Sequence, residues 1–119
     1  MDIIEERMKA REAVVARVGE WVSMLDFSVT AVLVGSYARG DFNLWSDVDV
    51  LLVSDSFPER PLDRLKMVDP PEGVEVIPLT RKDFYRLVNK KNPLVVDAQK
   101  YGILLRDDLG LFKDRQSST

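Results

Sequence analysis

A glycine-serine pair and two aspartates occupy the ends of two short apolar segments of the chain. Gly35 and Ser36 follow the first segment, and Asp47 and Asp49 open the second. A glycine after a strand permits a tight turn whose backbone can approach a ligand. A serine hydroxyl and the free N–H groups of a helix that begins there can bind a phosphate. The Gly35-Ser36 pair therefore predicts a phosphate-binding turn.

Asp47 and Asp49 are predicted to lie on one face of a strand, because residues two apart point to the same side, about 6.5–7 Å from each other. Val48, Val50 and Leu52 then take the buried face. Two carboxylates on one face repel each other unless a cation lies between them, and many phosphoryl-transfer enzymes place two magnesium ions about 4 Å apart in such a position. The pair indicates a site for two Mg²⁺ ions; two solvated aspartates at a strand end are the alternative.

Glu75 is the one acid in the apolar segment Val74 to Pro78. A charged side chain in such a strand needs a partner, and a place in the same metal site as Asp47 and Asp49 provides one. Glu75 can then bind metal, act as the base that deprotonates an acceptor hydroxyl, or do both. A solvated charge on an edge strand is the alternative interpretation.

Two side chains in the loop between the predicted turn and Asp47 have open interpretations. Arg39 can bind triphosphate oxygens through its planar guanidinium, or it can form a structural salt bridge. Trp45 can stack on a nucleobase or a partner, or it can pack the loop onto the sheet, which is the role we favour. Ser46 is expected to orient the turn before Asp47 through a local hydrogen bond.

The spacing of these residues carries a resemblance to a known family. Gly35-Ser36, ten further residues and Asp47-Val48-Asp49 resemble the signature of the DNA-polymerase-β-like nucleotidyltransferase superfamily. The segment Ala38-Arg39-Gly40 is also typical of its minimal nucleotidyltransferase (MNT) domain. The resemblance extends from the first predicted helix to about Asp108.

This resemblance implies a magnesium-dependent enzyme that transfers a nucleoside monophosphate, AMP from ATP, to a hydroxyl acceptor. Asp47 and Asp49 would hold both ions, and Gly35 and Ser36 would bind the β- and γ-phosphates. The third acid of the family is more often Asp, so the choice between metal ligand and base stays open for Glu75.

The resemblance also implies a partner. Larger members of the superfamily use extra domains to hold the base and the acceptor, and the minimal group pairs with a helical HEPN-family protein. In such a toxin–antitoxin pair the nucleotidyltransferase is the antitoxin and adenylylates the toxin. Two alternatives stay open: a stand-alone enzyme that modifies a small molecule such as an aminoglycoside, and a non-catalytic nucleotide-binding module.

Composition excludes several other classes. The chain has 119 residues with 45% hydrophobic content, which suits one domain over residues 1–119 with a frayed tail from about 115. A net charge of −3 and a pI near 5.0 argue against a broad nucleic-acid surface. The absence of Cys and His excludes a Ser-His-Asp or Cys-His mechanism, a zinc site and a redox dithiol. We expect a cytoplasmic protein without a membrane segment.

Apolar periodicity and breakers predict an α/β (α+β) fold, with a mixed sheet of about four strands and helices packed on it. The first two strands should be antiparallel neighbours because both must reach the same phosphates, and the third should be parallel to the second through a crossover. The predicted strands are Val29 to Val34, a segment from Asp47, Val74 to Pro78 and Ile103 to Arg106. The predicted helices are Asp2 to Met24, Leu62 to Met67, a helix capped by Thr80 and Asp83, Pro93 to Lys100, and a short one from Asp107 through Phe112. The first of them is amphipathic, and its apolar residues are expected on the core: Ile4, Met8, Val15, Val18 and Val22.

Overall fold

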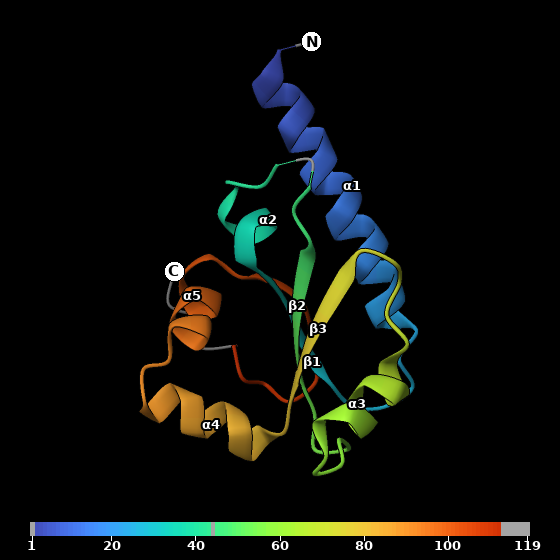
Figure 1. Cartoon of the computed structure of the whole chain (residues 1–119), viewed down its shortest axis with the longest axis vertical. Coiled ribbons are helices and arrows are strands. Elements are labelled where there is room, and N and C mark those ends of the chain that lie inside the picture. Colours follow the sequence, from blue (N-terminus) through green and yellow to red (C-terminus); the bar gives the residue numbers. More distant parts are fainter. Residues whose placement is uncertain (1, 44, 113–119) are drawn as a thin grey trace.

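The computed structural model describes residues 2–43 and 45–112, which contain five helices and four strands (Figure 1). The helices are α1 (Ile3–Ser23), α2 (Gly35–Arg39), α3 (Pro61–Val68), α4 (Arg81–Asn89) and α5 (Pro93–Tyr101). The strands are β1 (Thr30–Val34), β2 (Val48–Val53), β3 (Val74–Leu79) and β4 (Ile103–Asp107). Among the helices in these ranges, none combines the length and apolar character that a membrane span requires.

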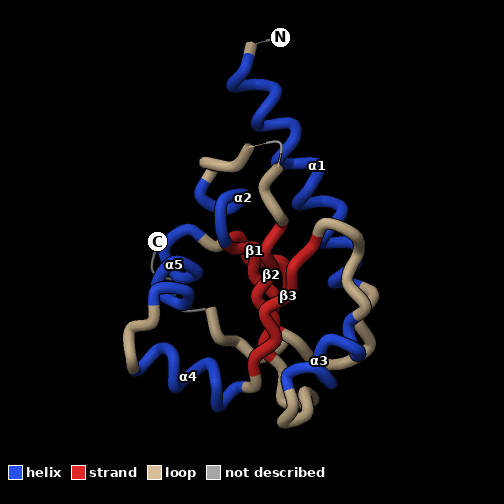
Figure 2. The backbone as a smooth tube through the Cα atoms, viewed as in Figure 1, coloured by secondary structure: helices blue, strands red, loops and turns tan. Residues whose placement is uncertain are grey.

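The four strands form one mixed sheet in the order β3-β2-β1-β4. β1 pairs antiparallel with both β2 and β4, whereas β3 runs parallel to β2 and reaches it through the crossover that contains α3. Both predicted pairings and the predicted fold class are confirmed. As a result, the end of β1 and the starts of β2 and β3 lie at the same end of the sheet (Figure 2).

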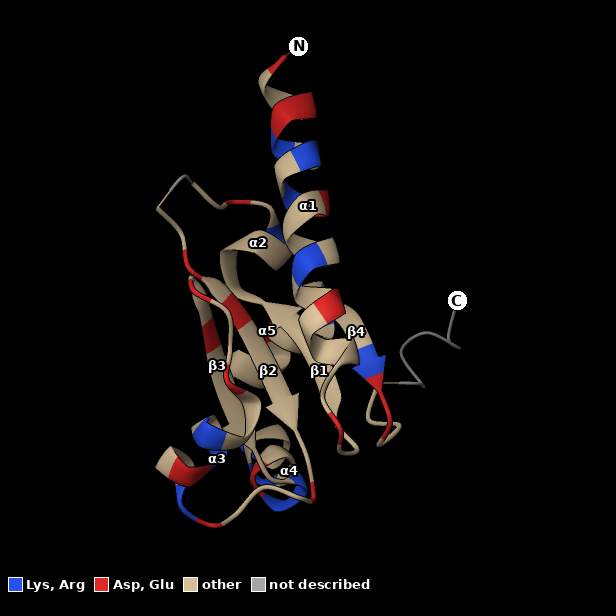
Figure 3. Ribbon diagram, turned by 90° about the vertical axis from the view of Figure 1, so that its right-hand side faces the viewer, with Lys and Arg blue, Asp and Glu red and all other residues tan. Residues whose placement is uncertain are grey.

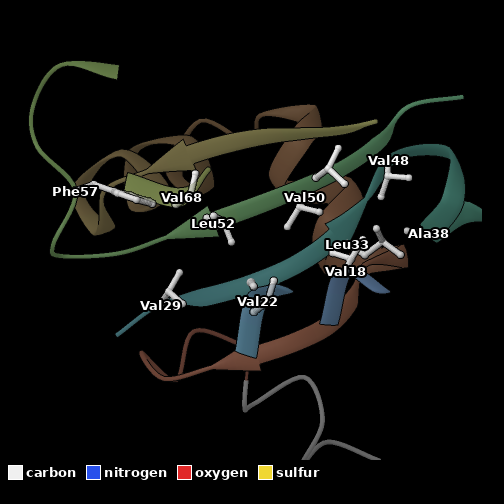
Figure 4. Packing of buried hydrophobic residues seen from close by; sticks show 12 residues of the cluster. Val18, Val22, Val29, Leu33, Ala38, Val48, Val50, Leu52, Phe57 and Val68 are labelled. Atoms are coloured by element: carbon white, nitrogen blue, oxygen red, sulfur yellow. The ribbon is translucent and has the colours of Figure 1, made fainter. Parts of the chain in front are cut away.

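Helices cover both faces of the sheet. On one face Val18 and Val22 of α1 and Val68 of α3 pack with Leu33 and Val50 (Figure 4). The opposite face carries a second apolar cluster, to which α4 contributes Phe84 and α5 contributes Val95 and Ala98. Because both faces are covered, every residue of β1 is buried, and Asp49 is the one residue of β2 that is not.

The first half of α1 extends beyond the sheet, as Figure 1 shows. Ile3, Ile4 and Met8 are 72%, 70% and 57% exposed, so the prediction that Ile4 and Met8 lie on the core is wrong. The reason is length: a helix of 21 residues is about 31 Å long, whereas a strand of five or six residues is only about 17–20 Å long. The buried stripe of α1 therefore begins further along the helix and includes Val18 and Val22.

The predicted short helix from Asp107 is also wrong. Asp107 ends β4, and its carboxylate accepts hydrogen bonds from the backbone N–H groups of Leu111 and Phe112 at 2.9 and 3.1 Å. These side-chain contacts hold residues 108–112 in a turn instead of a helix. The predicted frayed tail from about residue 115 lies outside the described residues.

Arg64 ties α3 to the start of α4. Its buried guanidinium donates to the Asp83 carboxylate at 2.8 Å and to three backbone carbonyls, those of Pro58, Glu59 and Pro78. Asp83 also forms the predicted capping box with Thr80. Burial acts to raise the pKa of Asp83, but hydrogen bonds from Thr80 and Arg64 outweigh it, so the pKa of this carboxyl lies below its ordinary value.

We expect Asp83→Asn to destabilise the protein by about 1–3 kcal/mol at pH 7, because it leaves the buried Arg64 charge without its counterion. A carboxyl whose folded pKa is lowered contributes stability above its unfolded pKa, and this contribution is lost as pH falls through the folded pKa. The difference in melting temperature between parent and variant should therefore narrow below about pH 4. Thermal melts at pH 7 and at decreasing pH check this.

The matched control for this prediction is Asp63→Asn. Asp63 pairs with Arg60 and Lys66 only at 3.9 and 3.7 Å on the surface, so its loss should change the melting temperature little at any pH. A difference between Asp83→Asn and the parent that stays constant from pH 7 to pH 3 would contradict the ion-pair explanation.

Candidate active site

The chain turns from β1 into α2 at Gly35, the first residue of α2, and this turn makes a close contact with β2. Gly35 has a φ of +74°, a conformation that favours glycine. A Cβ atom on Gly35 would lie 2.4 Å from Oδ2 of Asp49 and 3.3 Å from its Cγ. The antiparallel register pairs Val34 with Asp49 and so brings this carboxylate against the turn. The Asp49 carboxylate can therefore occupy this position only because Gly35 has no side chain.

The predicted acids gather at this end of the sheet. Asp49 and Glu75 are register partners on the neighbouring parallel strands β2 and β3, and Figure 3 shows the two acidic positions side by side. Asp47 lies just before β2 and is exposed, as is Glu75. Burial and the negative charges of Glu75 and Asp47 raise the pKa of Asp49, and Arg39 partly opposes them. The site thus disfavours further negative charge and favours a cation.

A divalent metal ion fits this donor set. Within residues 2–43 and 45–112, no three Asp or Glu side chains converge closely enough to hold a metal ion among themselves. Mg²⁺ nevertheless usually binds through one or two carboxylates together with phosphate and water oxygens. Burial, and after it repulsion by Glu75 and Asp47, raise the pKa of Asp49, and a bound cation would favour the ionised carboxylate against both effects. Asp49, with Asp47 and Glu75 near it, can supply the protein's share of the ligands.

Arg39 forms the salt bridges that were one of its two predicted roles. Its Nη1 donates to Asp97 of α5 at 2.9 Å, and its Nε donates to Asp41 at 3.3 Å. Asp97 was not predicted as part of the site. The only signal in the sequence is an acid inside the otherwise apolar stretch Val95 to Ala98 of α5, and that pattern alone does not say which residue the acid faces.

Two arginines of α1 hold α2 and the loop after it. Arg11 donates to the carbonyls of Tyr37 and Ala38 at 2.9 and 2.6 Å, and Arg7 donates to the carbonyls of Gly40 and Phe42. The last carbonyls of a helix have no partner within the helix, and α2 is only five residues long. Arg11 supplies donors for two carbonyls of α2, and Arg7 supplies them for the C-cap Gly40 and for Phe42 in the loop.

Aromatic contacts reinforce this attachment. Phe42 stacks on Tyr37 with ring centroids 4.2 Å apart, and the guanidinium of Arg7 lies 4.6 Å from the centroid of the Phe42 ring. The part of α1 that projects beyond the sheet is therefore a support for the loop that leads from the turn to Asp47.

Trp45 is 87% exposed, so the favoured prediction that it packs the loop onto the sheet is wrong. Its backbone N–H donates to the Asn43 side chain at 2.8 Å, in a local turn that directs the indole outward. The predicted local hydrogen bond of Ser46 is present, since its hydroxyl accepts from the Asn43 N–H at 2.9 Å.

Comparison with known proteins agrees with this arrangement. Residues 7–112 match the family model described as the nucleotidyltransferase domain. The chain belongs to this family. The nucleotidyltransferase domain also resembles a crystal structure from Sulfolobus solfataricus, of a protein for which nucleotidyltransferase activity has been inferred, with 25% sequence identity, a TM-score of 0.53, and coverage of 85% of this chain and 83% of the other. No curated protein shows significant similarity.

These findings confirm the family resemblance that was drawn from the spacing of Gly35-Ser36 and Asp47-Val48-Asp49. The nucleotidyltransferase domain match spans every predicted site residue, from Gly35 to Glu75, and also Arg11 and Asp97.

We expect Gly35→Ala to destabilise the nucleotidyltransferase domain for two separable reasons. The positive φ alone costs about 1–2 kcal/mol for a residue with a Cβ, and the new methyl group also collides with the Asp49 carboxylate. Gly73 has a similar φ of +83°, but no atom lies within 4 Å of the place that a Cβ atom would take there, so Gly73→Ala should show the conformational cost alone.

The melting temperatures should therefore fall further for Gly35→Ala than for Gly73→Ala. Adding Asp49→Ala to Gly35→Ala should recover the part of the loss in melting temperature that is due to the collision with the carboxylate. Thermal melts of Gly35→Ala, Gly73→Ala and the double variant measure this. Equal losses for Gly35→Ala and Gly73→Ala, with no recovery in the double variant, would show that Asp49 does not depend on the glycine.

Proposed function

We propose that this nucleotidyltransferase domain is a magnesium-dependent enzyme that transfers a nucleoside monophosphate, AMP from ATP, to a hydroxyl acceptor. The observation that carries the proposal is the contact of the Asp49 carboxylate with the Gly35 turn, together with its register partner Glu75. It brings two acids to the glycine-serine turn for which we propose phosphate binding. Membership of the family supports transfer chemistry of this class.

The chain's own residues take distinct roles in this proposal. Gly35 and Ser36 bind the β- and γ-phosphates, and Arg39 binds the triphosphate through the donors of its guanidinium. Asp47 and Asp49 would hold two Mg²⁺ ions, with Glu75 completing the second site. The ions, when bound, neutralise the charge of the phosphate oxygens.

The proposed reaction needs positioning more than acid–base power. The acceptor oxygen forms a bond to the α-phosphorus, the bond from that phosphorus to the bridging oxygen breaks, and pyrophosphate leaves with the electron pair. The hydroxyl proton passes to solvent or to Glu75, which is exposed at the edge strand β3 and thus open to an acceptor. No histidine is required.

The proposed acceptor is a helical HEPN-family protein, with this chain as the antitoxin of the pair in the cytoplasm. Exposed apolar side chains support a protein partner: Ile3, Ile4 and Met8 on the projecting half of α1, and Trp45 on the loop beside it. The same half of α1 holds the loop between α2 and Asp47 through Arg7, so a partner bound there would lie next to the site. Residues 1–119 would form a single domain that relies on this partner to complete the cleft.

A small cationic acceptor such as an aminoglycoside is the second candidate. It is favoured by a surplus of acids at the site. Asp47 and Glu75 act on the pKa of Asp49, and Asp41 and Asp97 form salt bridges with Arg39. The negative electrostatic potential of these carboxylates attracts a positively charged acceptor.

The experiment is incubation of the protein with α-labelled ATP and magnesium, alone, with an aminoglycoside, and with a co-expressed helical neighbour. We expect label on the helical protein, and Asp49→Asn should abolish it. Because the charge of Asp49 is unfavourable in the metal-free site, Asp49→Asn should melt no lower than the parent, which separates loss of chemistry from loss of fold.

Asp55→Asn is the control, since Asp55 follows β2 at the opposite end of the sheet and pairs with Arg81. It should keep full transfer. Transfer that survives in Asp49→Asn would overturn the metal-site assignment, label on the aminoglycoside alone would favour the stand-alone enzyme, and nucleotide binding without any transfer would favour the non-catalytic module.

A further inference from the structure

Asp97 reaches the candidate site from a separate element. Strand alternation places Asp49 on the same face of β2 as Leu51, which is the face covered by α4 and α5. α5 packs against both β1 and α2, and from it the Asp97 carboxylate accepts a hydrogen bond from Nη1 of Arg39 at 2.9 Å. Arg39 in turn is the cation that acts on the pKa of Asp49. A side chain 58 residues from Arg39 in the chain thus bounds the site.

The two carboxylates on Arg39 differ in how firmly they are held. Asp41 is in the exposed loop two residues after Arg39, and its contact with Nε is 3.3 Å long. Asp97 is fixed by the core, because its neighbours Val95 and Ala98 on α5 are fully buried in the apolar cluster. Asp97 therefore sets the direction of the guanidinium relative to the sheet, whereas Asp41 holds it only from the exposed loop.

The contacts leave most of the guanidinium available. An arginine side chain carries five N–H donors, and the two contacts with Asp41 and Asp97 use one on Nε and one on Nη1. In the described part of the chain, no hydrogen bond engages Nη2 of Arg39. The remaining donors can meet phosphate oxygens while Asp97 stays bound.

We propose that Asp97 is a positioning residue, which holds the Arg39 guanidinium toward the triphosphate of the bound nucleotide. The inference rests on the proposed function, and it assigns to α5 a part in nucleotide binding that lies outside the Gly-Ser and Asp-x-Asp segments. Arginine loses much rotamer freedom when it binds a ligand, and a carboxylate that orders it beforehand removes part of that loss.

If Asp97 were only a nearby negative charge without a positioning role, its effect on nucleotide affinity would have the opposite sign. Asp97 repels a polyphosphate through space, so its neutralisation would strengthen nucleotide binding if charge alone mattered. If Asp97 positions Arg39, its neutralisation weakens binding. The sign of the change in affinity therefore separates the two roles.

The experiment measures the Kd of ATP with magnesium by titration calorimetry for the parent, Asp97→Asn, Arg39→Ala and the double variant, with thermal melts of each. We expect Asp97→Asn to raise Kd about 2- to 10-fold, the range for ordering one flexible side chain. In the Arg39→Ala background the same change should have no further effect. Asp55→Asn removes an equally short carboxylate contact with an arginine, Arg81, at 2.8 Å and should leave Kd unchanged.

Asp97→Glu keeps the negative charge and should retain more affinity for ATP than Asp97→Asn. This variant controls for a change in folding caused by substitution at position 97. An unchanged or lower Kd for Asp97→Asn would overturn the inference, and so would an equal loss in the presence and absence of Arg39. A parent that binds ATP but transfers no label contradicts the enzymatic proposal and leaves the affinity comparison as the test of Asp97. A parent that binds no nucleotide would overturn both.

Discussion

The close approach of the Asp49 carboxylate to Gly35 is the constraint on which the candidate site depends. A carboxylate can lie against a turn only where the turn lacks a side chain, and the positive φ of Gly35 gives the turn its shape. The antiparallel register of β1 and β2 then fixes which acid meets the turn, and the parallel register of β2 and β3 fixes which acid lies beside it. A shift of one residue in either pairing would put a different residue beside the turn or beside Asp49 and would move the shifted side chains to the other face of the sheet.

This arrangement places negative charge at one end of a largely apolar sheet. β2 is buried along its whole length apart from Asp49, and that side chain carries a raised pKa because burial and two other acids oppose its ionisation. A structure selected for stability alone would place an apolar residue there. The unfavourable charge lies against the Gly35 turn and beside Glu75, and unfavourable charges of this kind are common at functional sites.

The sheet and the family could be predicted from the sequence because their signals are local. Alternation after Asp47, the glycine at 35 and the ten-residue spacing each lie within a short segment, and the Thr80 and Asp83 cap is a four-residue pattern. The contacts that orient the site are not local. Arg11 meets Tyr37 across 26 positions and Arg39 meets Asp97 across 58, and no periodicity indicates which charged side chain faces which carbonyl or carboxylate. The prediction that Trp45 packs onto the sheet is wrong for a related reason. The local turn formed with Asn43 directs the indole outward and overrides the preference of an indole for burial.

α1 shows how one element can serve both the fold and the site. Its second half packs Val18 and Val22 onto the sheet, whereas its first half has no sheet beneath it and is attached through Arg7 and Arg11 to α2 and the following loop. The apolar residues that this half exposes therefore contribute little to the stability of the sheet. A ligand bound to them would act on the backbone of α2 and of the loop after it through these two arginine side chains, without any change in the core. The surface of α1 is thus linked by direct hydrogen bonds to the segment that follows Gly35 and Ser36.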